Sequence, residues 1–169
     1  IDVETAVLGC VLVDPEIAWK IKSELTHRDF SVGIHKQVFG AICKLLDASE
    51  PVDILTVANV LENQGVTEVR GQPTFAYVAS LLNVVPTSMN FESYARIVKH
   101  DSVRRQLIDI AGRIATVAHT NDLTTAKMLA TVRGEVDNLT LRTVESASTV
   151  REIASEFIEH LQNDKPVGL

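Results

Sequence analysis

The sequence predicts an all-α fold, in which a small helical globule is followed by a long antiparallel helical hairpin, a linker and one amphipathic helix. Hydrophobic residues make up 46% of the 169 residues but aromatic residues only 5%, so the core must consist mainly of aliphatic side chains. With only 8 Gly and 5 Pro, the chain has room for long helices and disfavours a many-turned β-sandwich. The expected boundaries are 1–89 for the globule, 90–142 for the hairpin, 143–148 for the linker, 149–163 for the last helix and 164–169 for a final segment.

Three helices are expected at the start of the globule. The first covers residues 3–12 with Asp2 as its N-cap, and the second follows Asp14, with a proline in its first turn. The third runs from about Val32 to Ala48, and His35 beside its apolar stripe is expected to be a hydrogen-bonded core or cap histidine.

Residues 51–65 are ambiguous, because their β-branched side chains would also suit a strand. Asp53 as N-cap and Gly65 as terminator make a short helix the more consistent prediction. Residues 66–72 are expected to form a loop or a small hairpin, and Pro73 to start the next helix.

The longest predicted element follows Asn90, which is a suitable cap, and continues to about Thr120. Its length of roughly 30 residues corresponds to about 45 Å at the rise of an α-helix. Thr124 is expected to cap a second helix after a tight polar connection, so the two helices should fold back as an antiparallel hairpin.

The last helix is predicted beyond a small, polar linker, with Thr149 and Glu152 forming its capping box. Its apolar side consists of Val150, Ile153, Ala154, Phe157, Ile158 and Leu161. Because this helix has no core of its own, we expect it to dock on something that this chain does not contain.

Charge is unevenly distributed around the net value of −6. Residues 96–142 carry 8 basic and 5 acidic side chains, a net charge of +3, whereas the rest of the chain is acidic. An acidic globule binds phosphates poorly, so only this middle segment could contact nucleic acid or an acidic protein surface. Its basic side chains lack interleaved aromatic residues, and a solvated helix face that includes Lys99, Ser102 and Arg104 is the simpler expectation.

No catalytic, cofactor-binding or metal-ligating residues are assigned. His100 and Asp101 are the best enzyme-like signal, but a metal-dependent phosphohydrolase would need further His and Asp ligands at a recognisable spacing. Residues 33–40 lack the Gly-Lys-Ser/Thr ending of a phosphate loop. Cys10 and Cys43 are expected to be buried free thiols in a reducing, cytosolic setting, and no apolar run has membrane-spanning length.

Four landmarks carry a resemblance to a known family, in order across about a hundred residues. They are E-x-A-V-L-G at Glu4 to Gly9; Phe30 followed by His35, Val38 and Phe39; P-V-D with Thr56; and V-P-T followed by Asn90, Tyr94, Arg104 and Arg105. Together they resemble the N-terminal domain of the DnaB-type replicative DNA helicases of bacteria. Gly71-Gln72 stands where family members often have Gly-Gly, so this loop is expected to differ.

The resemblance implies that hairpins pair between subunits and that three such dimers form a collar on a hexameric ring. It implies primase as a partner, a helicase loader as a further candidate, and docking of the last helix on the ATPase domain of a neighbouring subunit. The parent protein would unwind DNA with ATP and Mg²⁺ in a domain beyond Leu169, to which residues 164–169 would lead. This chain would then hold no cofactor, bind DNA weakly or not at all, and lie in the bacterial cytoplasm with the nucleoid.

The residues expected to contact a second copy belong to the hairpin, whose apolar side chains exceed what a two-helix arm can bury by itself. They are Tyr94, Val98, Leu107, Ile110, Ile114, Leu129, Val132 and Val136. Two alternatives stay open from the sequence: a phosphohydrolase centred on His100 and Asp101, and a free-standing helical adaptor or loader-like protein.

Overall fold

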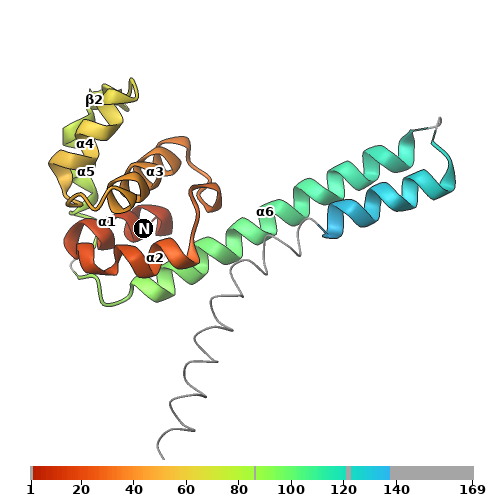
Figure 1. Cartoon of the computed structure of the whole chain (residues 1–169), viewed down its shortest axis with the longest axis horizontal. Helices are drawn as coiled ribbons and strands as arrows, with labels where there is room; N and C mark the ends of the chain where they lie inside the picture. The colour runs from red at the N-terminus through yellow and green to blue at the C-terminus, as the bar shows by residue number, and fades with distance from the viewer. Residues whose placement is uncertain (1, 86, 121–122, 138–169) are drawn as a thin grey trace, which may run out of the picture. The chain divides into compact units, whose positions relative to one another are not determined.

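The computed structural model describes residues 2–85, 87–120 and 123–137 of the chain, and it confirms the all-α class (Figure 1). The elements in order are α1 (Val3–Val13), η1 (Pro15–Ile17), α2 (Ala18–Glu24), η2 (His27–Asp29), α3 (Gly33–Asp47), α4 (Ile54–Asn63), β1 (Glu68–Val69), β2 (Gln72–Pro73), α5 (Thr74–Leu81) and α6 (Phe91–His119). Residues 125–137 are helical as well.

The chain divides into two compact units between Arg105 and Gln106. We call the described residues up to Arg105 the globule, and the described residues from Gln106 to Asp137 the arm. The first fifteen residues of α6 therefore belong to the globule, because the apolar side chains of Phe91, Ala95 and Val98 lie in its core.

Side-chain caps begin the helices where the sequence predicts them. Asp2 accepts a hydrogen bond from the Glu4 amide of α1 at 3.1 Å. Asp53 and Thr56 form a reciprocal capping box on α4, in which Asp53 Oδ1 accepts from the Thr56 amide at 2.8 Å and Thr56 Oγ1 accepts from the Asp53 amide at 3.0 Å. This box resolves the ambiguity of residues 51–65 in favour of a helix.

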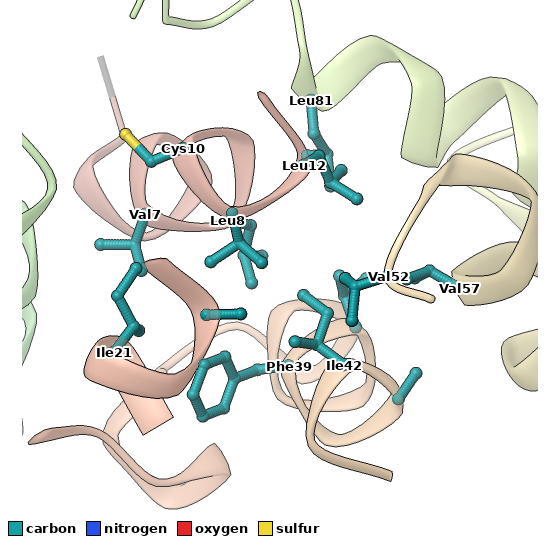
Figure 2. Close-up of a cluster of buried hydrophobic side chains, with 14 of the residues drawn as sticks. Val7, Leu8, Cys10, Leu12, Ile21, Phe39, Ile42, Val52, Val57 and Leu81 are labelled. Atoms are coloured by element: carbon teal, nitrogen blue, oxygen red, sulfur yellow. The ribbon is translucent and has the colours of Figure 1, made fainter. Parts of the chain in front are cut away.

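The core of the globule is aliphatic, as the composition predicts. Side chains from α1, α2, α3 and α5 meet in it (Figure 2), and Leu8, Ile21, Ile42 and Leu81 are no more than 1% exposed. The rings of Phe30 and Phe39 lie with their centroids 4.9 Å apart.

Gly9 lets α1 and α5 approach closely. A Cβ atom at this position would lie 2.6 Å from the backbone oxygen of Leu81 and 3.1 Å from the Val85 side chain. The glycine that ends the first landmark is therefore required by packing between two helices.

A small antiparallel hairpin joins α4 to α5, with Val69 opposite Gln72. The two turn residues, Arg70 and Gly71, have φ angles of 52° and 80°. A two-residue hairpin turn needs positive φ at both positions, which Gly71 adopts without steric cost.

Several predicted segments fall outside the described residues. They are the end of the hairpin at 138–142, the linker at 143–148, the last helix at 149–163 with all its docking residues, and the segment 164–169. None of the helices in the described ranges has the length and apolarity needed to cross a bilayer.

Candidate functional site

The arm exposes large apolar side chains. Leu107 on α6 is 50% exposed, and Leu129 and Val136 on the second helix are 66% and 46% exposed. Ile110, also a predicted contact residue, is instead buried and is the one buried residue among the described residues of the arm. The predicted contact residues Ile114 and Val132 are half-buried. The arm thus has a narrow internal seam and a surplus of apolar surface.

The two helices of the arm are tied together by an ion pair. Arg113 on α6 contacts Glu135 Oε2 through Nε at 3.0 Å and through Nη2 at 2.9 Å. The second helix begins where the sequence predicts, because Thr124 Oγ1 accepts from the Lys127 amide at 3.4 Å. The hairpin can therefore form within one chain and still leave its apolar side chains uncovered.

Two of the predicted contact residues belong to the packing of the globule instead of the arm. Val98 is 3% exposed in the core, and Tyr94 packs against that core. Both lie on the first two turns of α6, which the sequence assigned to the hairpin but which pack on the globule. We therefore leave Tyr94 and Val98 out of the candidate surface.

A buried carboxylate holds the next turns of α6 on the globule. Asp29, 3% exposed at the end of η2, accepts hydrogen bonds from Ser102 Oγ at 2.7 Å and from Lys99 Nζ at 3.2 Å. The amide and hydroxyl of Thr26 donate to the same carboxylate at 2.8 and 3.0 Å, and the Arg105 guanidinium donates to the Asp29 carbonyl oxygen. We call these five residues the Asp29 cluster.

The Asp29 cluster corrects the expectation of a solvated helix face at Lys99, Ser102 and Arg104. Ser102 is 2% exposed and Lys99 is half-buried, and only Arg104 is exposed. The expectation was wrong because the acceptor lies seventy residues away in sequence, where helical periodicity gives no sign of it.

A second buried carboxylate joins α1 to α3. Glu4, 7% exposed, accepts from the Ser31 amide at 2.5 Å, from the Val32 amide at 3.2 Å and from His35 Nδ1 at 2.8 Å. Because α3 has no side-chain cap of its own, Glu4 supplies the negative charge at its N-terminus from another helix. His35 is 1% exposed and hydrogen-bonded, which confirms its prediction as a core histidine.

The environment of Glu4 favours its ionised form. Burial alone would raise the pKa of this carboxyl group, but the hydrogen bonds from Ser31, His35 and Val32 outweigh burial and hold the pKa below its ordinary value of 4.5. Burial raises the pKa of the Cys10 and Cys43 thiols, which are both free. Cys10 is fully buried as predicted, whereas Cys43 is only half-buried.

His100 and Asp101 are exposed to solvent. Their side chains are 70% and 50% exposed, with His100 Nδ1 3.6 Å from Asp101 Oδ1. The described ranges contain no group of three or more His, Cys, Asp or Glu that could hold a metal ion. The pair therefore has none of the converging ligands in this part of the chain that a phosphohydrolase centre needs.

Glu4 and Asp29 are the structural residues that sequence reasoning missed. Glu4 was singled out as part of a landmark, but its partners lie about thirty residues away. Thr26-x-x-Asp29 matches a capping box, which the structure contains in η2, and this signal could have identified Asp29 as a cap. Nothing in this pattern indicates that the same carboxylate also accepts hydrogen bonds from side chains of α6.

The comparisons with known protein families, sequences and structures all identify the same family. Residues 1–100 match the family model described as the DnaB-like helicase N terminal domain. Over 123 residues, which are 72% of this chain, the sequence is 37% identical to the replicative DNA helicase DnaB of Geobacillus stearothermophilus. The match covers 26% of that relative, so the chain spans about a quarter of its length.

Two solved structures share the fold. The crystal structure of the N-terminal domain of DnaB helicase from Mycobacterium tuberculosis is 27% identical, with a TM-score of 0.71 over 80% of this chain and 94% of that one. A DnaB-like replicative helicase, described with its interactions with primase, has a TM-score of 0.66 at 24% identity, over 90% of this chain and 34% of that one.

Proposed function

This chain belongs to the DnaB-like helicase N-terminal domain family, and from that premise we propose that it is the non-catalytic assembly domain of a replicative DNA helicase. In this proposal the arms of two copies pair, and three such pairs form the collar of a hexameric ring. ATP, Mg²⁺ and the unwinding of DNA belong to a further domain of the parent protein. The protein would act in the bacterial cytoplasm, at the nucleoid.

One observation supports the pairing of copies. The side chains of Leu107, Leu129 and Val136 stay about half exposed or more, although an ion pair joins the two helices of the arm. Burying such side chains is favourable, at roughly 1.5–3 kcal/mol for each one covered completely. A second copy brings the same side chains to the contact, so each apolar contact occurs twice in a two-fold pair.

Primase is the external partner that we propose. The support is the family membership together with the DnaB-like helicase of similar fold, which is described with its interactions with primase. A helicase loader is a second candidate partner on the family resemblance. The predicted docking of the last helix, with Phe157 at the centre of its apolar side, remains part of the proposal.

Sedimentation of the 169-residue chain tests the pairing surface. We expect concentration-dependent dimers, and we expect Leu129→Ser to weaken dimerisation by about tenfold or more, because one apolar contact is lost from each copy. Leu55→Ser is the matched control, since Leu55 on α4 is 69% exposed but lies outside the arm. A chain that stays monomeric at high micromolar concentration would contradict the proposal, as would equal effects of the two substitutions.

Binding of the C-terminal domain of the cognate primase tests the recruitment of the partner. We expect the wild-type chain to bind with a dissociation constant that is measurable by titration calorimetry. If the chain forms dimers yet shows no heat of binding at high concentrations of both proteins, the primase part of the proposal is refuted and the pairing part stands.

A further inference from the structure

The basic excess of residues 96–142 is concentrated on the part of α6 that lies in the globule. Residues 96–105 carry four Lys or Arg side chains and one Asp, a net charge of +3, whereas residues 106–142 carry four basic and four acidic side chains. Residues 1–95 carry 6 basic and 12 acidic side chains, a net charge of −6. The globule is therefore acidic apart from one basic stretch of α6.

The 3-10 helix η2 places a further cation beside this stretch. The Asp29 carboxylate accepts a hydrogen bond from Lys99 Nζ at 3.2 Å, and the Asp29 carbonyl oxygen accepts from the Arg105 guanidinium. Arg28 and His27 immediately precede Asp29, and both are exposed. Adjacent Cα atoms are about 3.8 Å apart, so Arg28 begins next to the residue on which two cations of α6 converge. We call Arg28, Lys99 and Arg105 the basic patch.

One carboxylate contacts the three cations of the basic patch. The Asp29 carboxylate pairs with Lys99, but Arg105 contacts an uncharged carbonyl oxygen. Neither Arg28 nor Arg105 forms an ion pair with a carboxylate among the described residues. Together with Asp29 the basic patch thus has a net charge of +2. Its two guanidinium groups can still receive carboxylates from outside the chain.

We propose that the basic patch binds an acidic segment of a partner protein. The inference goes beyond the proposed function and does not depend on the pairing of copies. Guanidinium groups bind carboxylates through two parallel hydrogen bonds, a geometry that suits Asp and Glu side chains. Each exposed ion pair contributes little by itself, so the partner must supply several acidic side chains close together.

A protein segment fits the basic patch better than a nucleic acid does. Lys99 and Arg105 are six residues apart on α6, about 9 Å at the rise of an α-helix, so the patch covers only a few anionic groups. A nucleic acid gains affinity by having many phosphates neutralised, and the acidic remainder of the globule would repel a long polyanion. The described residues of η2 and α6 include no exposed aromatic side chain that could stack on a base.

Fluorescence anisotropy with a labelled peptide of eight glutamate residues tests the inference. We expect the 169-residue chain to bind this probe at low salt with a dissociation constant of about 10–100 µM. A peptide of eight glutamine residues should not bind, because it offers no carboxylates. A wild-type chain that does not bind the glutamate peptide, or that binds both peptides equally, would contradict the inference.

Arg28→Glu locates the binding site of the probe. Arg28 is exposed and forms no ion pair with the described residues, so the variant should fold normally. Reversing this charge is expected to weaken binding of the glutamate peptide by about fivefold to tenfold. Arg70→Glu is the matched control, because Arg70 is also exposed, lies in the turn between β1 and β2, and undergoes the same change of charge. Equal losses in the two variants would show that net charge alone attracts the probe, and the inference would be wrong.

His27→Arg provides a second measurement, one that a folding defect cannot imitate. The substitution adds a permanent positive charge beside Arg28, and we expect it to tighten binding of the glutamate peptide by about twofold to threefold. Unchanged or weaker binding by this variant would refute the assignment of the surface.

Two further measurements exclude other occupants of the basic patch. A labelled oligothymidylate of fifteen nucleotides should bind more weakly than the glutamate peptide. Tighter binding that is lost in Arg28→Glu would make the patch a nucleic-acid surface and overturn the inference. Sedimentation of Arg28→Glu should match that of the wild type, since weaker self-association would mean that a second copy occupies the patch. The proposed function is judged separately, by whether the wild-type chain forms dimers.

Discussion

The globule and the arm differ in which side chains they bury. The globule buries two carboxylates, Glu4 and Asp29, and gives each of them several donors, while its aliphatic side chains are almost fully enclosed. Among the described residues of the arm only Ile110 is buried, and the side chains of Leu107 and Leu129 are half exposed or more. One unit is complete within a single chain, and the other leaves apolar surface that a partner can cover.

This difference indicates where stability and function lie. A buried charge with all its partners fixes one arrangement of the globule, because any alternative leaves the charge unpaired. The arm has few such constraints, so substitutions on its surface should change association more than folding. Substitutions in the globule should change folding more than association. Three substitutions in the globule test this contrast.

The largest effect is expected for Asp29→Ala. The substitution removes the buried carboxylate that accepts hydrogen bonds from the Ser102 hydroxyl, the Thr26 amide and the ammonium group of half-buried Lys99. We expect the free energy of unfolding to fall by about 3–5 kcal/mol, as it does when one partner of a buried charge pair is removed. Urea denaturation followed by circular dichroism measures it.

A surface carboxylate provides the control for Asp29→Ala. Glu62 is exposed on α4, and Glu62→Ala should change the free energy of unfolding by no more than about 0.5 kcal/mol. A similar small change for Asp29→Ala would show that the Asp29 cluster contributes little to stability and would remove the contrast between globule and arm.

A smaller effect is expected for Gly9→Ala. The added Cβ would meet the Leu81 backbone oxygen at 2.6 Å, and a backbone atom cannot move aside as a flexible side chain can. We expect a loss of about 2–3 kcal/mol in the free energy of unfolding, within the range for overpacked cores. Gly40→Ala is the matched control, because nothing lies within 4 Å of its added Cβ, and it should stabilise α3 by up to about 1 kcal/mol. Equal effects of the two substitutions would refute the close contact.

The sequence predicts the helices well and their long-range contacts poorly. Asp2, Asp53 and Thr124 cap helices as predicted, because each acts on amides within three residues of itself. Such local signals are complete in the sequence. The class of fold and the aliphatic core follow from composition and periodicity in the same way.

Contacts between distant segments are the part that sequence could not supply. Periodicity separates buried from exposed faces, but it assigned Lys99 and Ser102 to solvent because polar residues usually lie there. It also placed Val98 on the hairpin surface, since nothing in a uniform helical pattern marks where α6 stops packing on the globule. Of the predicted contact residues in the arm, the ones that are exposed are Leu107, Leu129 and Val136, whereas Ile110 is buried. Helical periodicity does not show which apolar side chains two paired helices bury against each other.

The smallest effect is expected for Glu4→Gln, and it depends on pH. The pKa of Glu4 lies below 4.5 in the folded chain, so its carboxylate contributes stability above that pH, and the contribution is lost as the pH falls through the folded pKa. At pH 7 we expect the variant to be less stable by about 1–2 kcal/mol, because Gln presents an NH₂ group to the donors of Ser31 and Val32. The difference between wild type and variant should shrink as the pH is lowered below 4.5.

Urea denaturation between pH 7 and pH 3.5 measures this difference. The other groups near the site are His35 and Asp2, whose Oδ2 lies 3.9 Å from His35 Nδ1. Asp2→Asn is therefore the control: Asn caps a helix about as well as Asp, and Asp2 is half exposed, so the stability gap of this variant should stay small. A gap for Glu4→Gln that stays constant down to pH 3.5 would mean that the carboxylate charge does not hold α1 and α3 together. The contrast between a globule fixed by buried charges and an arm without them would then rest on Asp29 alone.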